Sequence, residues 1–272
     1  MGRNTVKGAQ VNLNRWGRAR MKISFNGQLV NIKDSPCTDT GWLIGAGIFE
    51  TIRTVSGQPY ALELHLQRAL GSSRAMNVPM PSFVEIRESV GDLLDAQPLS
   101  DGMLRISFDA RGDWAAVHLP YEPVTKAASV CIHPDALPSQ GAAIKSYPYE
   151  HRLSILNEAK LLGFDEALVV NTEGNICEGA VSNVIACIDG KWITPPTSDG
   201  VLPGIMRDLV IANNGVVVQS LPLARIGDVT SAVLLSSLRI ASDVASIQSR
   251  PLQPSRAFVD EIRAMARLHS VG

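Results

Sequence analysis

The sequence predicts a mixed α+β protein made of a small N-terminal part and a larger C-terminal part. Short apolar runs end in turn pairs such as Asn26-Gly27, Ser56-Gly57 and Asp189-Gly190, which is typical of strands joined in hairpins. Between these runs, apolar residues recur at helical spacing. The 272 residues, 45% of them hydrophobic, supply enough core for one large domain or two modest ones.

The N-terminal part is expected to span residues 21–122, beginning with a hairpin around Asn26-Gly27. Ser82 and Glu85 suit a capping box at the start of a helix. Strands are expected at residues 22–25, 28–30, 48–55, 59–62, 103–108 and 115–119, and helices at 63–76 and 82–96. The glycines between residues 41 and 47 precede a strand rather than a helix, which excludes a dinucleotide-binding turn.

A linker over residues 123–127 is expected to lead into the C-terminal part, residues 128–272. The apolar residues Leu153, Leu156, Ala159 and Leu162 recur at helical spacing and predict an amphipathic helix that Gly163 ends. Strands are expected at residues 167–170, 175–178, 184–188, 192–194 and 232–235, and further helices end near residue 213 and span 257–268.

Composition and charge exclude several classes of protein. A net charge of −1 gives no electrostatic reason to expect nucleic acid, and no apolar run approaches the length that crosses a bilayer. Residues 1–20 are basic and lack an apolar segment, so a disordered extension is expected rather than a secretory signal peptide. The cysteines form no CxxC pair, which argues against a metal site or a disulfide framework and favours reduced thiols in a cytoplasm: Cys37, Cys131, Cys177 and Cys187.

Lys145 is the lysine whose neighbours best predict an apolar setting, because it follows Ala142, Ala143 and Ile144. Burial would lower the pKa of its amine and make it a nucleophile. Local context alone favours a solvated surface lysine, since most lysines are exposed. The same holds for Glu178 as a strand carboxylate and for Arg68 as a charge on a helix. Their occurrence together with a glycine-rich helix entrance favours a site instead, since amides at a helix N-terminus suit a phosphate.

Several short motifs occur in a fixed order along the chain. They are Gly47-Ile-Phe-Glu-Thr-Ile-Arg53, His65-Leu-Gln-Arg68, Lys145, Asp165-Glu-Ala-Leu168, Gly174-Asn-Ile-Cys-Glu-Gly179 with Ser182-Asn183, and Leu202-Pro-Gly-Ile-Met-Arg207. From residue 21 to the C-terminus the chain thereby resembles the class IV aminotransferase family of fold type IV pyridoxal-phosphate enzymes. That family includes branched-chain and D-amino-acid aminotransferases and aminodeoxychorismate lyase. The resemblance implies a small N-terminal α/β domain and a larger, β-barrel-like C-terminal domain with helices.

The resemblance also implies a binding site for pyridoxal 5'-phosphate and no metal. Lys145 corresponds to the Schiff-base lysine that moves protons, and Glu178 to the partner of the pyridine nitrogen. The remaining roles are phosphate binding for Arg68, for the amides of Ile205 and Met206 and for Ser237 or Leu238, and contact with the ring hydroxyl for Tyr149. A homodimer acting on a small molecule, with neither membrane nor nucleic acid as partner, is the family's usual form.

The resemblance favours one reaction. The spacing from Lys145 to Asp165-Glu166 and the run Ser236-Ser-Leu-Arg239 are more similar to aminodeoxychorismate lyase, which converts 4-amino-4-deoxychorismate into 4-aminobenzoate and pyruvate for folate biosynthesis. Arg239 is then a candidate for a substrate carboxylate, although a surface charge is equally expected at this position. Residues 43–47 replace an aromatic and an acid found in many relatives, which leaves open an aminotransferase for a branched-chain or D-amino acid. A non-catalytic cofactor-binding relative is a third reading, which the retained lysine and glutamate disfavour.

Overall fold

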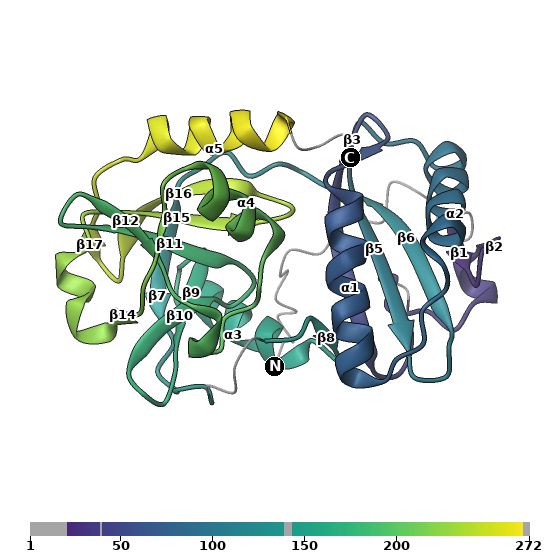
Figure 1. Ribbon diagram of the computed structural model, residues 1–272, viewed down its shortest axis with the longest axis horizontal. Coiled ribbons are helices and arrows are strands. Elements are labelled where there is room, and N and C mark those ends of the chain that lie inside the picture. Colours follow the sequence, from purple (N-terminus) through teal and green to yellow (C-terminus); the bar gives the residue numbers. More distant parts are fainter. Residues whose placement is uncertain (1–20, 39, 139–142, 269–272) are drawn as a thin grey trace, which may run out of the picture.

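The computed structural model describes residues 21–38, 40–138 and 143–268, and it has two lobes that lie side by side (Figure 1). One lobe is built on a seven-stranded sheet and the other on a ten-stranded sheet. Each sheet is covered by helices, so the predicted α+β class is confirmed. The extension expected over residues 1–20 lies outside the described residues.

The smaller lobe contains the sheet with the order β2-β1-β6-β5-β3-β4, in which β8 also pairs with β3. Its strands are β1 (Lys22–Phe25), β2 (Gln28–Asn31), β3 (Gly47–Val55), β4 (Gln58–Pro59), β5 (Asp101–Asp109), β6 (Trp114–Pro120) and β8 (Ser146–Tyr147). Its α-helices are α1 (Leu62–Met76) and α2 (Phe83–Ala96). Ile52 from β3, Leu66 from α1 and Ile86 from α2 are completely buried in one apolar cluster, which joins both helices to the sheet.

Local chemistry explains where several of these elements begin. Asn26 and Gly27 both have positive φ, as the predicted hairpin turn requires. The Ser82 side chain accepts a hydrogen bond of 3.2 Å from the Glu85 amide, so the predicted cap of α2 is present. The strand expected over residues 59–62 is wrong. Only Gln58–Pro59 pair with β3, and Ala61 at φ 51° then turns the chain into α1.

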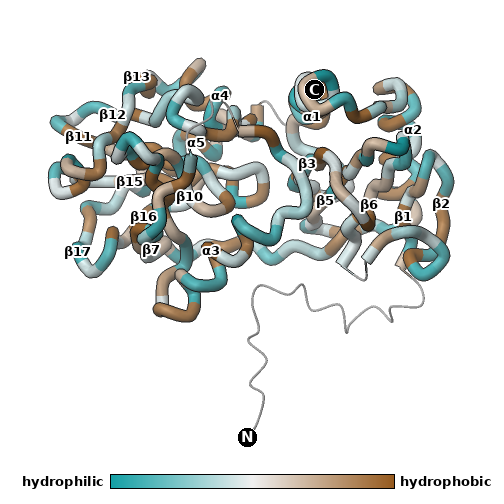
Figure 2. Tube along the Cα trace, turned by 90° about the horizontal axis from the view of Figure 1, so that it is seen from below, coloured by the Kyte–Doolittle hydropathy of each residue, from teal (hydrophilic) through white to brown (hydrophobic). Residues whose placement is uncertain are grey.

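The larger lobe contains the sheet with the order β13-β12-β11-β15-β16-β7-β9-β10-β14, with β17 paired to β16. Its strands are β7 (Ala128–Ile132), β9 (Glu166–Val170), β10 (Asn175–Gly179), β11 (Asn183–Ile188), β12 (Lys191–Thr194), β13 (Val217–Val218), β14 (Leu221–Pro222), β15 (Ser231–Ser236), β16 (Ile240–Ile247) and β17 (Arg250–Pro251). Its α-helices are α3 (Glu150–Leu161), α4 (Ile205–Asn213) and α5 (Arg256–Leu268). Figure 2 shows from below that α1 and α2 belong to one lobe and α3 to α5 to the other.

Helix α3 buries part of the face that the spacing predicts, Leu156 and Ala159, together with Ile155, which that spacing did not include. Leu153 and Leu162 are 37% and 73% exposed, whereas Ile155 is buried together with Leu156 and Ala159 in the cluster against β9. The reason is that α3 ends at Leu161, so Leu162 lies past its last turn, and the packed face is centred on Ile155. This orientation turns residue 152 toward the sheet, which matters for the site described below.

The two lobes meet beside Lys145. The strand β8, which follows Lys145 directly, belongs by sequence to the C-terminal part but pairs with β3 of the smaller lobe. The Phe49 amide on β3 also donates a 3.0 Å hydrogen bond to the Lys145 carbonyl oxygen. The fold therefore holds this lysine at the junction between the sheets. Among the described helices, none has the length and apolar character needed to span a bilayer.

Candidate active site

Lys145 projects its amine into a partly aromatic environment. Its Nζ lies 4.5 Å from the Phe49 ring centroid and 5.2 Å from the Tyr149 ring centroid. Burial, followed by the positive charge of Arg68, lowers the pKa of the Lys145 amine to about 8. A much larger fraction of this amine is neutral near pH 7 than of an ordinary lysine, and the neutral form is the nucleophile.

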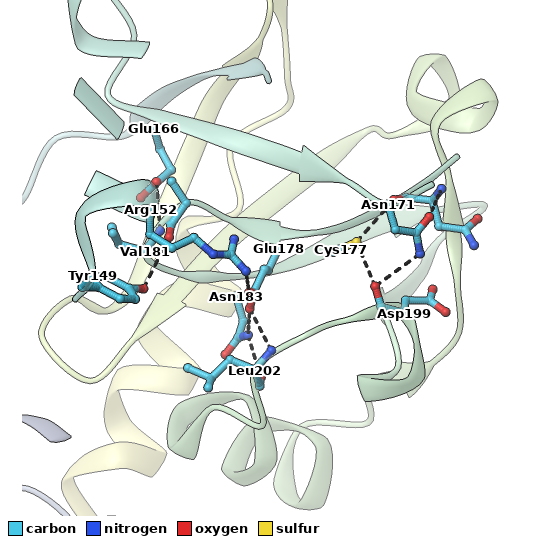
Figure 3. Close-up of polar contacts among 12 residues, drawn as sticks. Tyr149, Arg152, Glu166, Asn171, Cys177, Glu178, Val181, Asn183, Asp199 and Leu202 are labelled. Atoms are coloured by element: carbon cyan, nitrogen blue, oxygen red, sulfur yellow. Dashed lines mark hydrogen bonds and ion pairs between the residues drawn. The ribbon is translucent and has the colours of Figure 1, made fainter. Parts of the chain in front are cut away.

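Glu178 lies on β10 immediately after a register shift between Ile176 and Glu178, and such bulges re-aim side chains. Its carboxylate is almost completely buried. Oε1 accepts 2.7 Å from Arg152 Nη2, while Oε2 accepts 2.9 Å from Asn183 Nδ2 and 3.1 Å from the Leu202 amide (Figure 3). Burial raises the pKa of Glu178, and the charge of Arg152 opposes that rise. These donors fix the carboxylate in one orientation.

Asn183 connects Glu178 to the entrance of α4. Its Nδ2 donates to Glu178 and also, at 3.0 Å, to the Leu202 carbonyl oxygen. Gly204 packs so closely against it that a Cβ at this position would lie 1.9 Å from Asn183 Oδ1. Close approach of the backbone, rather than an unusual φ, therefore demands a glycine at residue 204.

Arg68 is part of a buried charge network that starts on β3. The Glu50 carboxylate accepts 2.9 Å from Arg68 Nε and 2.5 Å from Arg68 Nη2, and it lies 2.6 Å from His65 Nδ1. Burial alone would raise the pKa of Glu50, but Arg68 and His65 lower it to about 2. Arg68 Nη1 also donates 3.0 Å to the Pro203 carbonyl oxygen, which ties the smaller lobe to the loop before α4.

The start of α4 offers donors to an anion. Its N-cap, Gly204, has no capping side chain, so the first amides, including those of Ile205 and Met206, have no intrahelical partners. Of the five N–H groups of Arg68, three are used by Glu50 and Pro203, which leaves two. A cavity of about 350 Å³ lies beside these groups and is lined by Leu64, Arg68, Pro203, Ile205, Asp208 and Leu209.

The turn between β15 and β16 holds the other expected residues. Ser237 and Leu238 are half-buried there, and the Leu238 carbonyl oxygen accepts 3.4 Å from Arg53 Nη1. Arg239 forms a 3.0 Å ion pair with Glu166, whose side chain is completely buried. The structure thus gives Arg239 an internal carboxylate as its partner. Its proposed contact with a substrate would have to compete with this pair.

Tyr149 is the N-cap residue of α3, and its ring packs edge to face on Phe49 at 5.1 Å between centroids. Its hydroxyl donates to the Ala180 carbonyl oxygen at 3.5 Å. Burial raises the pKa of this phenol, so it is a neutral hydrogen-bond donor at physiological pH. The structure therefore brings Tyr149, Lys145 and Phe49 together.

Two arginines near the site were not singled out from the sequence. Arg152 is the partner of Glu178 described above. Arg105 lies on β5, its guanidinium 3.8 Å above the Trp42 ring, and donates 3.1 Å to the Thr40 carbonyl oxygen. Burial lowers the pKa of Arg105 to about 10, its Nε has no acceptor, and no described carboxylate lies within ion-pair distance. The sequence signal that could have revealed Arg105 is a charged residue within the apolar run at residues 103–108.

These features occur in a chain that belongs to the class IV aminotransferase family, whose model (Amino-transferase class IV) matches residues 47–247. Enzymes of this family depend on pyridoxal 5'-phosphate. A putative branched-chain-amino-acid aminotransferase of Methanocaldococcus jannaschii is 28% identical over 212 residues, 70% of this chain and 74% of that one. The aminodeoxychorismate lyase of Bacillus subtilis is 26% identical over 216 residues, 70% and 73% of the two chains. The branched-chain aminotransferase structure from Thermoproteus uzoniensis has a TM-score of 0.81 at 23% identity, covering 91% of this chain and 93% of that one, and shares the fold.

The residues present fit this cofactor. A lysine amine with a lowered pKa suits an aldehyde, and a fixed, buried carboxylate suits a protonated ring nitrogen. The unpaired amides at the α4 N-terminus, beside the free N–H groups of Arg68, suit a phosphate. We therefore expect Lys145, Glu178, Arg68, Ile205 and Met206 to hold it.

Replacing Gly204 with alanine is expected to lower the free energy of unfolding by about 1–3 kcal/mol, the usual cost of overpacking. The added methyl group must displace Asn183, which removes a donor from Glu178, so the affinity for pyridoxal phosphate should also fall. Urea unfolding and fluorescence titration with the cofactor measure the two effects. Gly71→Ala in α1 is the matched control, because its Cβ meets open space. If the two variants had equal free energies of unfolding and equal affinities for the cofactor, the close packing of Gly204 against Asn183 would not have the role given to it.

Proposed function

We propose that this protein is an aminodeoxychorismate lyase, which releases pyruvate from 4-amino-4-deoxychorismate and leaves 4-aminobenzoate. The observation that carries the proposal is the Lys145 amine with its lowered pKa, placed among the aromatic rings of Phe49 and Tyr149. Such walls suit a flat cyclic substrate. The buried guanidinium of Arg105, which has no carboxylate partner among the described residues, supports a substrate that carries one.

The bound cofactor supplies an electron sink for the carbanion that forms at the amine-bearing carbon of the substrate. Lys145, in its neutral form, takes the proton from that carbon and acts as general base. Glu178, held by Asn183 and the Leu202 amide, would be the carboxylate that accepts from the ring nitrogen. Arg68 and the α4 amides hold the phosphate. As the bond between the ring carbon and the enolpyruvyl oxygen breaks, protonated Lys145 would give its proton to the methylene carbon of that group, which leaves as pyruvate; aromatisation of the carbon ring drives the step.

An aminotransferase acting on branched-chain or D-amino acids is the alternative, and two observations favour it. The relative from Methanocaldococcus jannaschii has a slightly higher identity than the lyase of Bacillus subtilis. In addition, residues 43–47 lack the aromatic and acidic residues that many relatives have, and Leu43 is buried while Ile44 is exposed. An amino acid also carries a carboxylate, so Arg105 serves either substrate.

The cellular setting belongs to the same proposal. We place the enzyme in the cytoplasm, in folate biosynthesis, as a homodimer. All four cysteines are free, which supports a reducing compartment. Exposed apolar side chains such as Leu161 and Leu162 offer surface for a second copy of the chain.

The two enzymatic activities can be separated with the purified, cofactor-loaded protein. Incubation with 4-amino-4-deoxychorismate is expected to yield pyruvate and 4-aminobenzoate in equal amounts, measured by a coupled dehydrogenase assay and by chromatography. Amino acids alone should leave the visible absorbance of the bound cofactor intact over the same period. Lasting loss of that absorbance with an amino acid, without pyruvate from the chorismate derivative, would replace the lyase with an aminotransferase. If the protein shows neither pyruvate release nor loss of absorbance, both enzymatic assignments are contradicted.

A further inference from the structure

The two carboxylate oxygens of Glu178 accept different numbers of hydrogen bonds. Each carboxylate oxygen has two lone pairs. Oε2 uses both of them, for Asn183 Nδ2 at 2.9 Å and for the Leu202 amide at 3.1 Å. Oε1 uses one, for Arg152 Nη2 at 2.7 Å. A further donor, such as the protonated ring nitrogen of the cofactor, therefore finds its remaining position on Oε1, the oxygen already shared with Arg152.

Burial and the orientation of α3 keep Arg152 in contact with Glu178. Its side chain is 19% exposed and that of Glu178 is 6% exposed, so the pair is largely shielded from water. Among the described residues, Arg152 forms an ion pair with Glu178 alone, and its Nη1 is buried without an acceptor. The burial of Ile155 and Leu156 on the same helix fixes the side of α3 that faces the sheet.

We propose that Arg152 sets the protonation of the cofactor's ring nitrogen by sharing Oε1 of Glu178 with it. A carboxylate already neutralised by a guanidinium attracts a positively charged N–H less strongly than an isolated one does. The nitrogen therefore loses its proton at a lower pH than it would beside Glu178 alone. This inference rests on the proposed function, with the cofactor joined to Lys145 in front of Glu178.

The other titratable groups near Glu178 do not replace Arg152. Tyr149 and Cys177 are neutral near pH 7, because burial raises the pKa of both, that of Cys177 to about 12. Lys145 acts on Glu178 through its charge, without a hydrogen bond among the described contacts. Arg152 is thus the cation in direct contact with the carboxylate that faces the ring.

The protonation state of the ring nitrogen affects which reaction the cofactor favours. A ring whose nitrogen is less firmly protonated is a weaker electron sink. Such a ring favours the return of electrons to the substrate, as an elimination requires, over their retention on the cofactor. Arg152 acts through Glu178 and is a positioning residue.

Nitrogen-15 NMR of the enzyme loaded with ring-labelled pyridoxal phosphate measures this protonation directly. Across a pH titration, Arg152→Met is expected to raise the pKa of the ring nitrogen by about one to three units, the shift that a nearby unit charge causes. Arg152→Lys keeps the charge and should remain close to the wild type. Lys160→Met removes a charge elsewhere on α3 and should cause no shift.

An unchanged nitrogen pKa in Arg152→Met, with the cofactor fully bound, would overturn the proposal and leave Arg152 a purely structural role. If that variant does not fold, Arg152→Gln gives the same readout. Borohydride reduction and peptide mapping separate two outcomes. If only the role of Arg152 is wrong, Lys145 is still labelled; if the proposed cofactor site is wrong, Lys145 is unlabelled.

Discussion

Lys145→Ala is expected to lower kcat for pyruvate release by at least about 10²–10⁴-fold, the range that a general acid–base group contributes. The variant loses both the covalent anchor of the cofactor and the group that carries the proton. Single-turnover pyruvate measurements with saturating cofactor test this. Lys160→Ala, in the last turn of α3, is the matched control and should retain wild-type kcat. A Lys145→Ala enzyme with activity near that of the control would exclude Lys145 as the catalytic amine.

The lowered pKa of Lys145 also predicts a pH dependence. Because burial lowers the pKa of this amine to about 8, from an ordinary 10.5, its neutral fraction rises through pH 8 and is nearly complete above pH 9. The rate at which the apoprotein joins pyridoxal phosphate covalently should rise with pH and level off in the same range. A rate that continues to climb toward pH 10.5 would show an ordinary, solvated lysine instead. Stopped-flow absorbance at fixed cofactor concentration measures it.

Glu50→Ala is expected to lower the free energy of unfolding by about 3–5 kcal/mol, because it leaves the buried Arg68 without its counter-charge. The variant should also bind the cofactor more weakly, since Glu50 orients the arginine proposed to hold the phosphate. Urea unfolding of the apoprotein measures the first effect. Glu63→Ala is the control: its pair with Arg87 is exposed and should contribute less than about 1 kcal/mol. Similar losses in both variants would contradict the role given to the buried network.

The stabilisation by Glu50 has a predictable sign with pH. Its pKa is about 2 in the folded protein and 4.5 when unperturbed, so the unfolded chain binds the proton first as pH falls. The stabilisation is fully present above pH 4.5 and is lost as pH falls from there toward 2. The difference in stability between the wild type and Glu50→Ala should therefore narrow over this window.

Short-range chemistry made part of the fold predictable. The turn at Asn26-Gly27 and the cap at Ser82 depend on neighbouring residues only, and both are present. The strands β7 and β16 were not assigned, because a short run of small and apolar residues is equally compatible with a loop or a helix. Helix α3 was assigned and the burial of Leu156 and Ala159 is confirmed, but Ile155 rather than Leu153 completes its buried face, because the sheet against which it packs determines that face.

In the candidate site, too, the features that depend on local motifs were predictable, and those that depend on tertiary packing were not. The order of the motifs indicated Lys145, Glu178 and Arg68, and the structure gives each a distinct environment. Arg152 and Glu178 are 26 residues apart and meet only because α3 packs against β9, the strand with which β10 pairs. Arg239 pairs with Glu166 through the packing of the β15–β16 turn, and no local pattern reveals this partner. Charge pairing across elements is a property of the tertiary structure, whereas motif order is a property of the chain.

Reduction of the cofactor-loaded protein with borohydride, followed by peptide mapping, tests the central claim most directly. The pyridoxyl group is expected on the peptide that contains Lys145, at about one equivalent per chain, with the other lysines unmodified. A label on a different lysine, or an unlabelled Lys145 in fully loaded protein, would contradict the account of the site.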